Sequence, residues 1–159
     1  MIEIKVTGIP EVLLELEQLT PAIRKGLQQG MGRALLRLTR YVKQSKLTGQ
    51  ALHVRTGRLR RSIHSEMQTT PIMIEGTGGT NVKYARAHEF GFDGQVGVKA
   101  HLRTIKQAFR RAIAPIQIQV SAHSRHMHLP ERSFLRSALK ELEQDIRNDL
   151  RGGIDDALR

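Results

Sequence analysis

The chain has 159 residues, of which 39% are hydrophobic and 4% aromatic, and it contains neither tryptophan nor cysteine. This length suits one ordinary domain with its own core. The lack of cysteine excludes disulfides, thiolate zinc sites and thiol nucleophiles, and it suits a reducing compartment. The formal net charge of +11 favours partners that carry phosphate groups or acidic protein surfaces.

No segment suggests export or membrane insertion. The first five residues lack the basic and then apolar layout of a secretion signal. No apolar run approaches the roughly 18 to 20 residues that span a bilayer. We therefore expect a soluble protein without a membrane partner.

The start of the chain predicts a short strand followed by a short helix. Apolar and polar residues alternate over 2–6, and Gly8 ends the pattern. Pro10 suits the first position of a helix over 11–19.

A long helix is predicted from residue 21 to about residue 46, with Thr20 as its cap. Its apolar residues recur in steps of three and four, so they form one stripe that faces the core. Gly26, Gly30 and Gly32 weaken its first half. They either permit close packing on a neighbouring element or mark a bend.

The stretch from residue 18 to residue 65 contains no acidic residue. A block of positive charge of this kind attracts phosphate backbones or acidic surfaces, and the alternative is a solvated basic face with no specific partner. The candidate interface residues in this block are Arg33, Arg37, Arg40, Arg55, Arg58, Arg60 and Arg61.

Residues 56–63 predict a turn that leads into a new element. Gly57 is expected to take a backbone conformation that is closed to other residues. Leu59 and Ile63 are spaced to enter the core, while the arginines between them stay outside.

Two strands are predicted next, over 64–69 and 72–76, separated by Pro71. The glycines within 76–79 predict a hairpin turn, because the stretch lacks the lysine and the setting of a phosphate-binding loop.

Residues 84–91 predict a short helix that Gly91 ends. Tyr84 and Phe90 are its expected core anchors. Glu89 is an acid in a basic neighbourhood, so we expect it to pair with an arginine within or between subunits. Arg132 is expected to make a contact of the same kind.

The pattern V-x-A-H-x-R occurs twice, at 98–103 and 120–125. Both copies lie in segments of alternating hydrophobicity. They predict a two-stranded antiparallel ribbon over about 92–128, connected through 106–115, with one apolar and one basic face. Its candidate interface residues are Lys99, His101, Arg103, His123 and Arg125.

The last helix is predicted to start near Pro130 and to end at 152–153, with Phe134 and Leu135 in its buried stripe. This end of the chain is acidic. The contrast with the basic first half either helps one copy dock on the next or simply keeps the helix soluble.

The sequence offers no convincing catalytic, cofactor or metal site. Of the clustered histidines, His126 and His128 share a strand face while His123 takes the other, which is poor geometry for one metal ion. No serine lies in a nucleophile elbow. We therefore expect a protein that is not an enzyme and holds no cofactor; a histidine-dependent hydrolase or metalloprotein is the weakest alternative.

Three segments resemble a phage tail-component family. Residues 54–63 (VRTGRLRRSI) resemble its TGxLxxSI signature, residues 84–91 (YARAHEFG) its YAxxxEFG element, and residues 129–139 (LPERSFLRSAL) its PxRPFLxxAL element. Ser133 stands where the family often has proline. The order also matches, so the resemblance covers nearly the whole chain. The residues that carry it structurally are Gly57, Leu59, Tyr84, Glu89, Phe90, Gly91, Arg132, Phe134 and Leu135.

The resemblance implies a single α+β domain over 1–159, in which a long N-terminal helix and a C-terminal helix pack on a small antiparallel sheet with an inserted two-stranded β-ribbon. The family, to which the lambda minor tail protein Z is similar, belongs to the neck and tail-completion machinery of long-tailed phages. Its members are expected in the virion, assembled in the host bacterial cytoplasm, as rings that help join tails to heads around the DNA path.

The implied partners are further copies of the chain, other neck and tail proteins and, without sequence specificity, duplex DNA. The alternative function is a basic DNA-binding accessory protein of a phage, in packaging or regulation. Only the charge favours this alternative, because no zinc-finger spacing, basic zipper or set of stacking aromatics accompanies the arginines.

Overall fold

The computed structural model describes residues 2–6, 21–70, 73–108 and 111–159. It has mixed helix and strand content, which confirms the predicted α+β class. The chain divides into two compact units: Met1–Phe90 with Glu131–Arg159, and Gly91–Pro130. The helix predicted over 11–19 lies outside the described residues. No helix among the described residues is long and apolar enough to cross a membrane.

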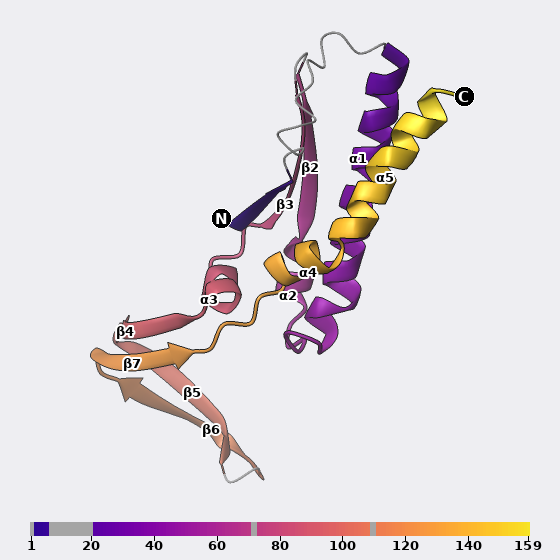
Figure 1. Ribbon diagram of the computed structural model, residues 1–159. Helices are drawn as coiled ribbons and strands as arrows, with labels where there is room; N and C mark the ends of the chain where they lie inside the picture. Colours follow the sequence, from indigo (N-terminus) through magenta and orange to yellow (C-terminus); the bar gives the residue numbers. More distant parts are fainter. Residues whose placement is uncertain (1, 7–20, 71–72, 109–110) are drawn as a thin grey trace. The chain divides into compact units, whose positions relative to one another are not determined.

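The first unit is built on a three-stranded antiparallel sheet. Its strands are β1 (Ile2–Val6), β2 (His64–Thr69) and β3 (Ile74–Thr80), with β3 in the centre. The long helix α1 (Pro21–Gln44) lies along this sheet, and α5 (Glu143–Ala157) lies along α1 (Figure 1).

The core lies between α1, the sheet and the C-terminal helices α4 (Arg136–Glu141) and α5. The predicted apolar stripe of α1 supplies its centre. Phe134 and Leu135, as predicted, are fully buried beside it. The buried α1 side chains are Leu27, Met31, Ala34, Leu35, Leu38 and Val42.

Glycines bring α1 and α5 into backbone contact. A Cβ atom on Gly26 would lie 2.0 Å from the carbonyl oxygen of Gly153, and one on Gly153 would lie 2.2 Å from that of Gly26. A Cβ atom on Gly30 would lie 2.6 Å from the carbonyl oxygen of Asp149. Close packing, not a bend, is therefore the role of Gly26 and Gly30.

The last helix differs from its predicted extent at both ends. It begins at Arg136 rather than near Pro130, and it is divided at Leu142 into α4 and α5. It also continues through Gly153 to Ala157. The sequence predicts a stop at Gly153, but a side chain at this position would overlap the backbone of α1, so the glycine is needed for that contact.

The predicted hairpin turn at 76–79 is wrong, because these glycines lie in the central strand β3. A Cβ atom on Gly76 would lie 2.7 Å from the Sδ atom of Met31. The absence of side chains lets the sheet approach α1 closely, and this packing overrides the turn preference of glycine.

The shorter elements follow the predicted turn signals. After α1 comes the 3-10 helix η2 (Lys46–Thr48), and then α2 (Arg58–Ser62), which follows Gly57 at a φ of +69°. The helix α3 (Ala85–Phe90) ends at Gly91, whose φ is +74°. The expected left-handed glycine before α2 and the expected glycine stop after α3 are both confirmed.

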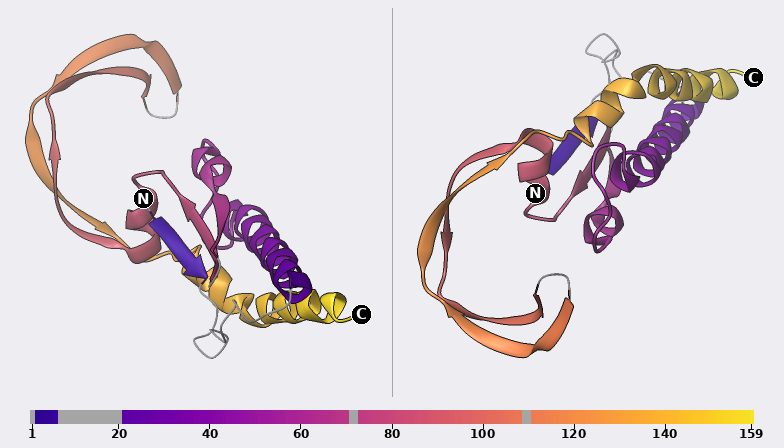
Figure 2. Two further views of the ribbon diagram at one scale, coloured as in Figure 1. Left: turned by 90° about the horizontal axis from the view of Figure 1, so that it is seen from above. Right: turned by 90° about the horizontal axis from the view of Figure 1, so that it is seen from below.

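The second unit is the predicted antiparallel ribbon. Strand β4 (Phe92–Val98) pairs with β7 (His123–Leu129), and β5 (His101–Ala108) pairs with β6 (Arg111–Val120). In both views of Figure 2 the paired strands follow one curved path. The predicted connector over 106–115 is too long, because the pairing continues to Ala108 opposite Arg111.

The V-x-A-H-x-R repeat forms the junction between the two strand pairs. Val98 pairs with His123, and His101 pairs with Val120. Nδ1 of His101 lies 2.9 Å from the carbonyl oxygen of Lys99, and Nδ1 of His123 lies 2.9 Å from that of Ser121. The two copies therefore build equivalent halves of one interruption in the ladder.

The predicted division of the ribbon into an apolar and a basic face is wrong. The register places Arg103 opposite Ile118 and His101 opposite Val120. Directly paired residues share a face of an antiparallel ribbon. Basic side chains of one strand therefore lie on the same face as apolar side chains of the other.

The helix contact gives a first testable prediction. Gly153→Ala should lower the free energy of unfolding by about 2 kcal/mol or more, because the added methyl group overlaps the backbone of α1. Gly32→Ala is the matched control, since a Cβ atom there meets nothing within 4 Å; it should gain up to about 1 kcal/mol from helix propensity. Urea unfolding of both variants measures the difference, and equal losses would contradict the close contact.

A second prediction concerns pH. Nζ of the buried Lys46 donates to Glu141 at 2.7 Å, and the Tyr41 hydroxyl donates to the same carboxylate at 2.7 Å. These bonds hold the pKa of Glu141 below its ordinary 4.5. The stability that they contribute is therefore present above pH 4.5 and lost as the pH falls through the lowered folded-state pKa.

Glu141→Gln should accordingly melt at a lower temperature than the unmodified protein at pH 7. The gap should close in acid, once the carboxylate of the unmodified protein is protonated. Thermal melting of both proteins across this range tests the point. A gap that stays constant with pH would mean that the carboxylate charge contributes nothing.

Candidate functional site

Two of the predicted interface arginines are occupied within the chain. Nε of Arg37 lies 2.7 Å from Oδ2 of Asp149, and Arg33 lies 3.6 Å from Asp156. The Asp149 carboxylate raises the pKa of Arg37. Part of the contrast between the basic first half and the acidic terminus is therefore neutralised between α1 and α5.

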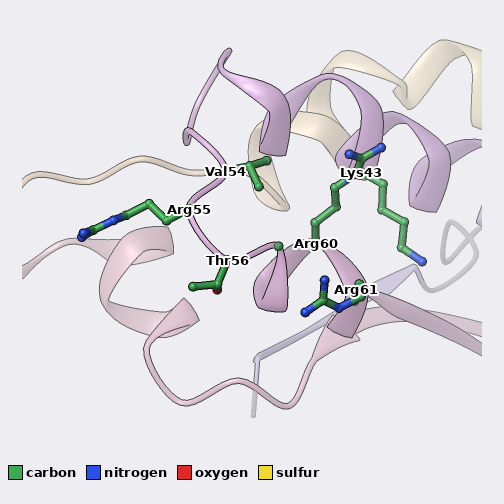
Figure 3. A pocket seen from close by; sticks show the side chains of 7 residues that line it. Lys43, Val54, Arg55, Thr56, Arg60 and Arg61 are labelled. Atoms are coloured by element: carbon green, nitrogen blue, oxygen red, sulfur yellow. The ribbon is translucent and has the colours of Figure 1, made fainter.

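The other predicted arginines of the first unit stay exposed. Within the described part of the chain, Arg40, Arg55, Arg58, Arg60 and Arg61 form no salt bridge. Of this set, Arg60 and Arg61 lie with Lys43 around one hollow at α2 (Figure 3). Arg55 points away from Arg60 and Arg61 in that view, and it also lines a second hollow.

This second hollow, here named the motif groove, joins the three segments that carry the family resemblance. Its volume is about 520 Å³. Residues 53–60 come from the first segment and its approach, Tyr84 and His88 from the second, and Arg132 from the third. Leu47 and Leu52 complete the lining.

The motif groove combines apolar and basic groups and has no acidic residue in its lining. Val54 is 48% exposed and Tyr84 44% exposed. Burial, and then the charge of Arg132, lowers the pKa of His88 below its ordinary 6.5. The His88 ring therefore adds little positive charge to the groove at pH 7.

Glu89 fixes the start of α4 beside the motif groove. Its fully buried carboxylate accepts hydrogen bonds from the backbone nitrogens of Phe134 at 2.8 Å, Leu135 at 3.0 Å and Arg136 at 2.9 Å. The Ser133 hydroxyl donates a further bond at 2.7 Å. A side chain distant in sequence thus satisfies amide groups that a helix start leaves unpaired.

The expected ion pair of Glu89 is confirmed, with Arg136 as its partner. Nε of Arg136 lies 3.3 Å from the Glu89 carboxylate, and the guanidinium lies 4.5 Å from the Phe90 ring centre. The backbone nitrogen of Arg132 donates to the His88 carbonyl at 2.8 Å. These bonds join the chain just before Gly91 to the chain just after Pro130, where the ribbon begins and ends.

The expected core anchors Tyr84 and Phe90 are wrong, because these side chains are 44% and 50% exposed. Ala85 and Glu89 are the buried residues of α3. They lie one helical turn apart, so they share the inward face. The first turn of α4 has no acidic residue of its own. This absence is the sequence signal that could have indicated a cap from elsewhere in the chain.

The predicted ribbon residues all lie in the second unit and are exposed: Lys99, His101, Arg103, His123 and Arg125. His126 and His128 share a face, as the strand parity predicted, and both contact Asp93 at 2.8 Å and 2.9 Å. No group of three His, Cys, Asp or Glu side chains in the described residues could hold a metal ion.

The capping role of Glu89 gives a third prediction. Glu89→Gln should cost about 2–4 kcal/mol of unfolding free energy, because an amide cannot accept all these bonds and Arg136 loses its buried partner. Glu131→Gln is the control: it removes an exposed pair with the same arginine and should cost less than about 1 kcal/mol. Chemical denaturation separates the two cases, and similar small losses would refute the cap.

Comparisons of the chain with protein-family models, with curated proteins and with solved structures found no match. The resemblance to the tail-component family therefore depends on the three segments themselves. Their meeting at one groove is a property of the fold that the sequence patterns alone do not contain.

Proposed function

We propose that this chain is a structural virion protein of a long-tailed bacteriophage. In this proposal it is a neck or tail-completion component that forms an oligomeric ring and helps join tail to head. The observation that carries the proposal is the meeting of the three resembling segments around the motif groove. The α+β fold that the resemblance implies supports it further.

The character of the motif groove favours a protein partner over duplex DNA. Contact with phosphate backbones needs positioned lysine and arginine side chains but no apolar surface. The groove lining instead includes the exposed side chains of Val54 and Tyr84 as well as arginines. An apolar patch with a charged border is typical of a protein interaction site.

The ribbon supports an assembly role independently. None of the described residues within Gly91–Pro130 is buried, and Leu102 and Ile116 are 68% and 54% exposed. An isolated two-stranded ribbon is marginally stable in water. Cover from a neighbouring subunit would remove this apolar surface from water, so the ribbon suits a protein that works inside an assembly.

The test is electron microscopy of lysates from the parent phage with this gene disrupted. Filled heads and unattached tails should accumulate separately. Complementation with Arg58→Glu should restore few joined particles, because the substitution reverses a charge in the motif groove. Arg86→Glu is the control, since Arg86 is an exposed arginine on the neighbouring helix α3 and does not line the groove; it should restore normal particles.

Normal infectious particles without the gene would refute the proposal. Tight and salt-sensitive binding of the purified protein to duplex DNA would then favour the accessory DNA-binding function. If both arginine variants restored joined particles equally well, the motif groove would not be the surface that acts in joining.

A further inference from the structure

We infer that the motif groove binds the acidic, leucine-rich segment 7–20 of a second copy of this chain. The inference deepens the proposed function, on which it rests for an oligomeric setting, by naming the contact between neighbouring subunits. It starts from the chemistry of the groove, whose lining combines arginines with apolar side chains and has no acidic residue. Such a groove fits a segment that carries both carboxylates and apolar side chains.

One stretch of the sequence has this chemistry. Residues 7–20 hold Glu11, Glu15 and Glu17 among six apolar residues other than proline, and no lysine or arginine. This stretch lies outside the described residues, so its composition alone enters the inference.

The acidic C-terminal helices are a poorer match for the motif groove. Their carboxylates are interspersed with basic residues. Asp149, Asp156, Glu141 and Glu143 already form salt bridges inside the chain.

Distance excludes the groove of the same chain. Segment 7–20 is joined directly to Pro21, the first residue of α1, whereas the groove lining begins at Leu47, which follows the other end of that helix. The 24 residues of α1 extend over about 36 Å. Leu13 is the leucine of the segment farthest from Pro21, and even a fully extended chain lets it reach at most about 29 Å from that residue. The leucines that would fill the groove must therefore come from another copy.

Disulfide trapping tests the contact directly, because the chain has no cysteine. One full-length variant carries Leu16→Cys, and another carries Val54→Cys at a residue that lines the groove. Mixed and oxidised, they should give a species of twice the 17.9 kDa chain mass that contains one copy of each variant. Leu36→Cys, at an α1 position that is 69% exposed and outside the groove, replaces Val54→Cys as the control and should give at least tenfold less product.

Charge reversal makes the test specific. Arg58→Glu added to the Val54→Cys variant should reduce the mixed product about tenfold, and Glu15→Lys with Glu17→Lys in the other variant should restore it. A peptide with the sequence of 7–20 should also bind the full chain and compete for the product, whereas its glutamine-substituted form should not. Equal competition by both peptides, or product that Arg58→Glu leaves unchanged, would overturn the inference, as would displacement by a duplex oligonucleotide alone.

The outcome is separable from that of the proposed function. A chain with both Leu16→Cys and Val54→Cys that closes only on itself, at the mass of one copy, would refute the contact between copies and leave the joining role standing. If the purified protein gave trapped pairs but the phage assembled normally without the gene, the joining role would be refuted and the self-association would stand.

Discussion

The buried carboxylate of Glu89 is the interaction on which the rest of the first unit depends. It holds the backbone amides at the start of α4 and pairs with Arg136, so it fixes where the C-terminal helices begin. The same bonds join the two points at which the chain leaves for the ribbon and returns from it. The 40 residues Gly91–Pro130 can therefore be inserted without separating α3 from α4, because the Glu89 bonds that hold these helices together lie within the first unit.

The second constraint is the contact of α1 with α5. Gly26, Gly30 and Gly153 bring the two backbones together, and the pairs Arg37–Asp149 and Arg33–Asp156 lie along the same contact. The acids of the terminal helix are thus largely used inside the chain. Arg55, Arg58 and Arg60 form no salt bridge among the described residues, and these three line the motif groove on the loop before α2 and on α2 itself.

Much of the fold could be predicted from local patterns, because α1, β2 and the left-handed glycines each depend on their own sequence neighbourhood. The wrong predictions concern residues whose local structure depends on a partner far away in the sequence. Gly76 resembles a turn signal, but it lies against Met31 in the fold. Gly153 resembles a helix stop, but it lies against Gly26. The faces of the ribbon depend on the register between strands, which alternation within one strand does not set. Glu89 was expected to pair with an arginine, but its capping bonds join residues 44–47 positions apart.

The positions of the two inferred contact surfaces also bear on the form of the assembly. The acidic segment precedes the first residue of α1, and the motif groove follows its last. In a pair of copies joined in this way, one groove and one acidic segment remain free. The contact is therefore heterologous, and further copies can add to both ends of the pair. If the rotation between copies closes, the product is a ring; if it does not, the product is a filament. In the proposed assembly, the exposed ribbon would add a second surface for neighbours, and such a repeated geometry would suit the proposed ring around a DNA path.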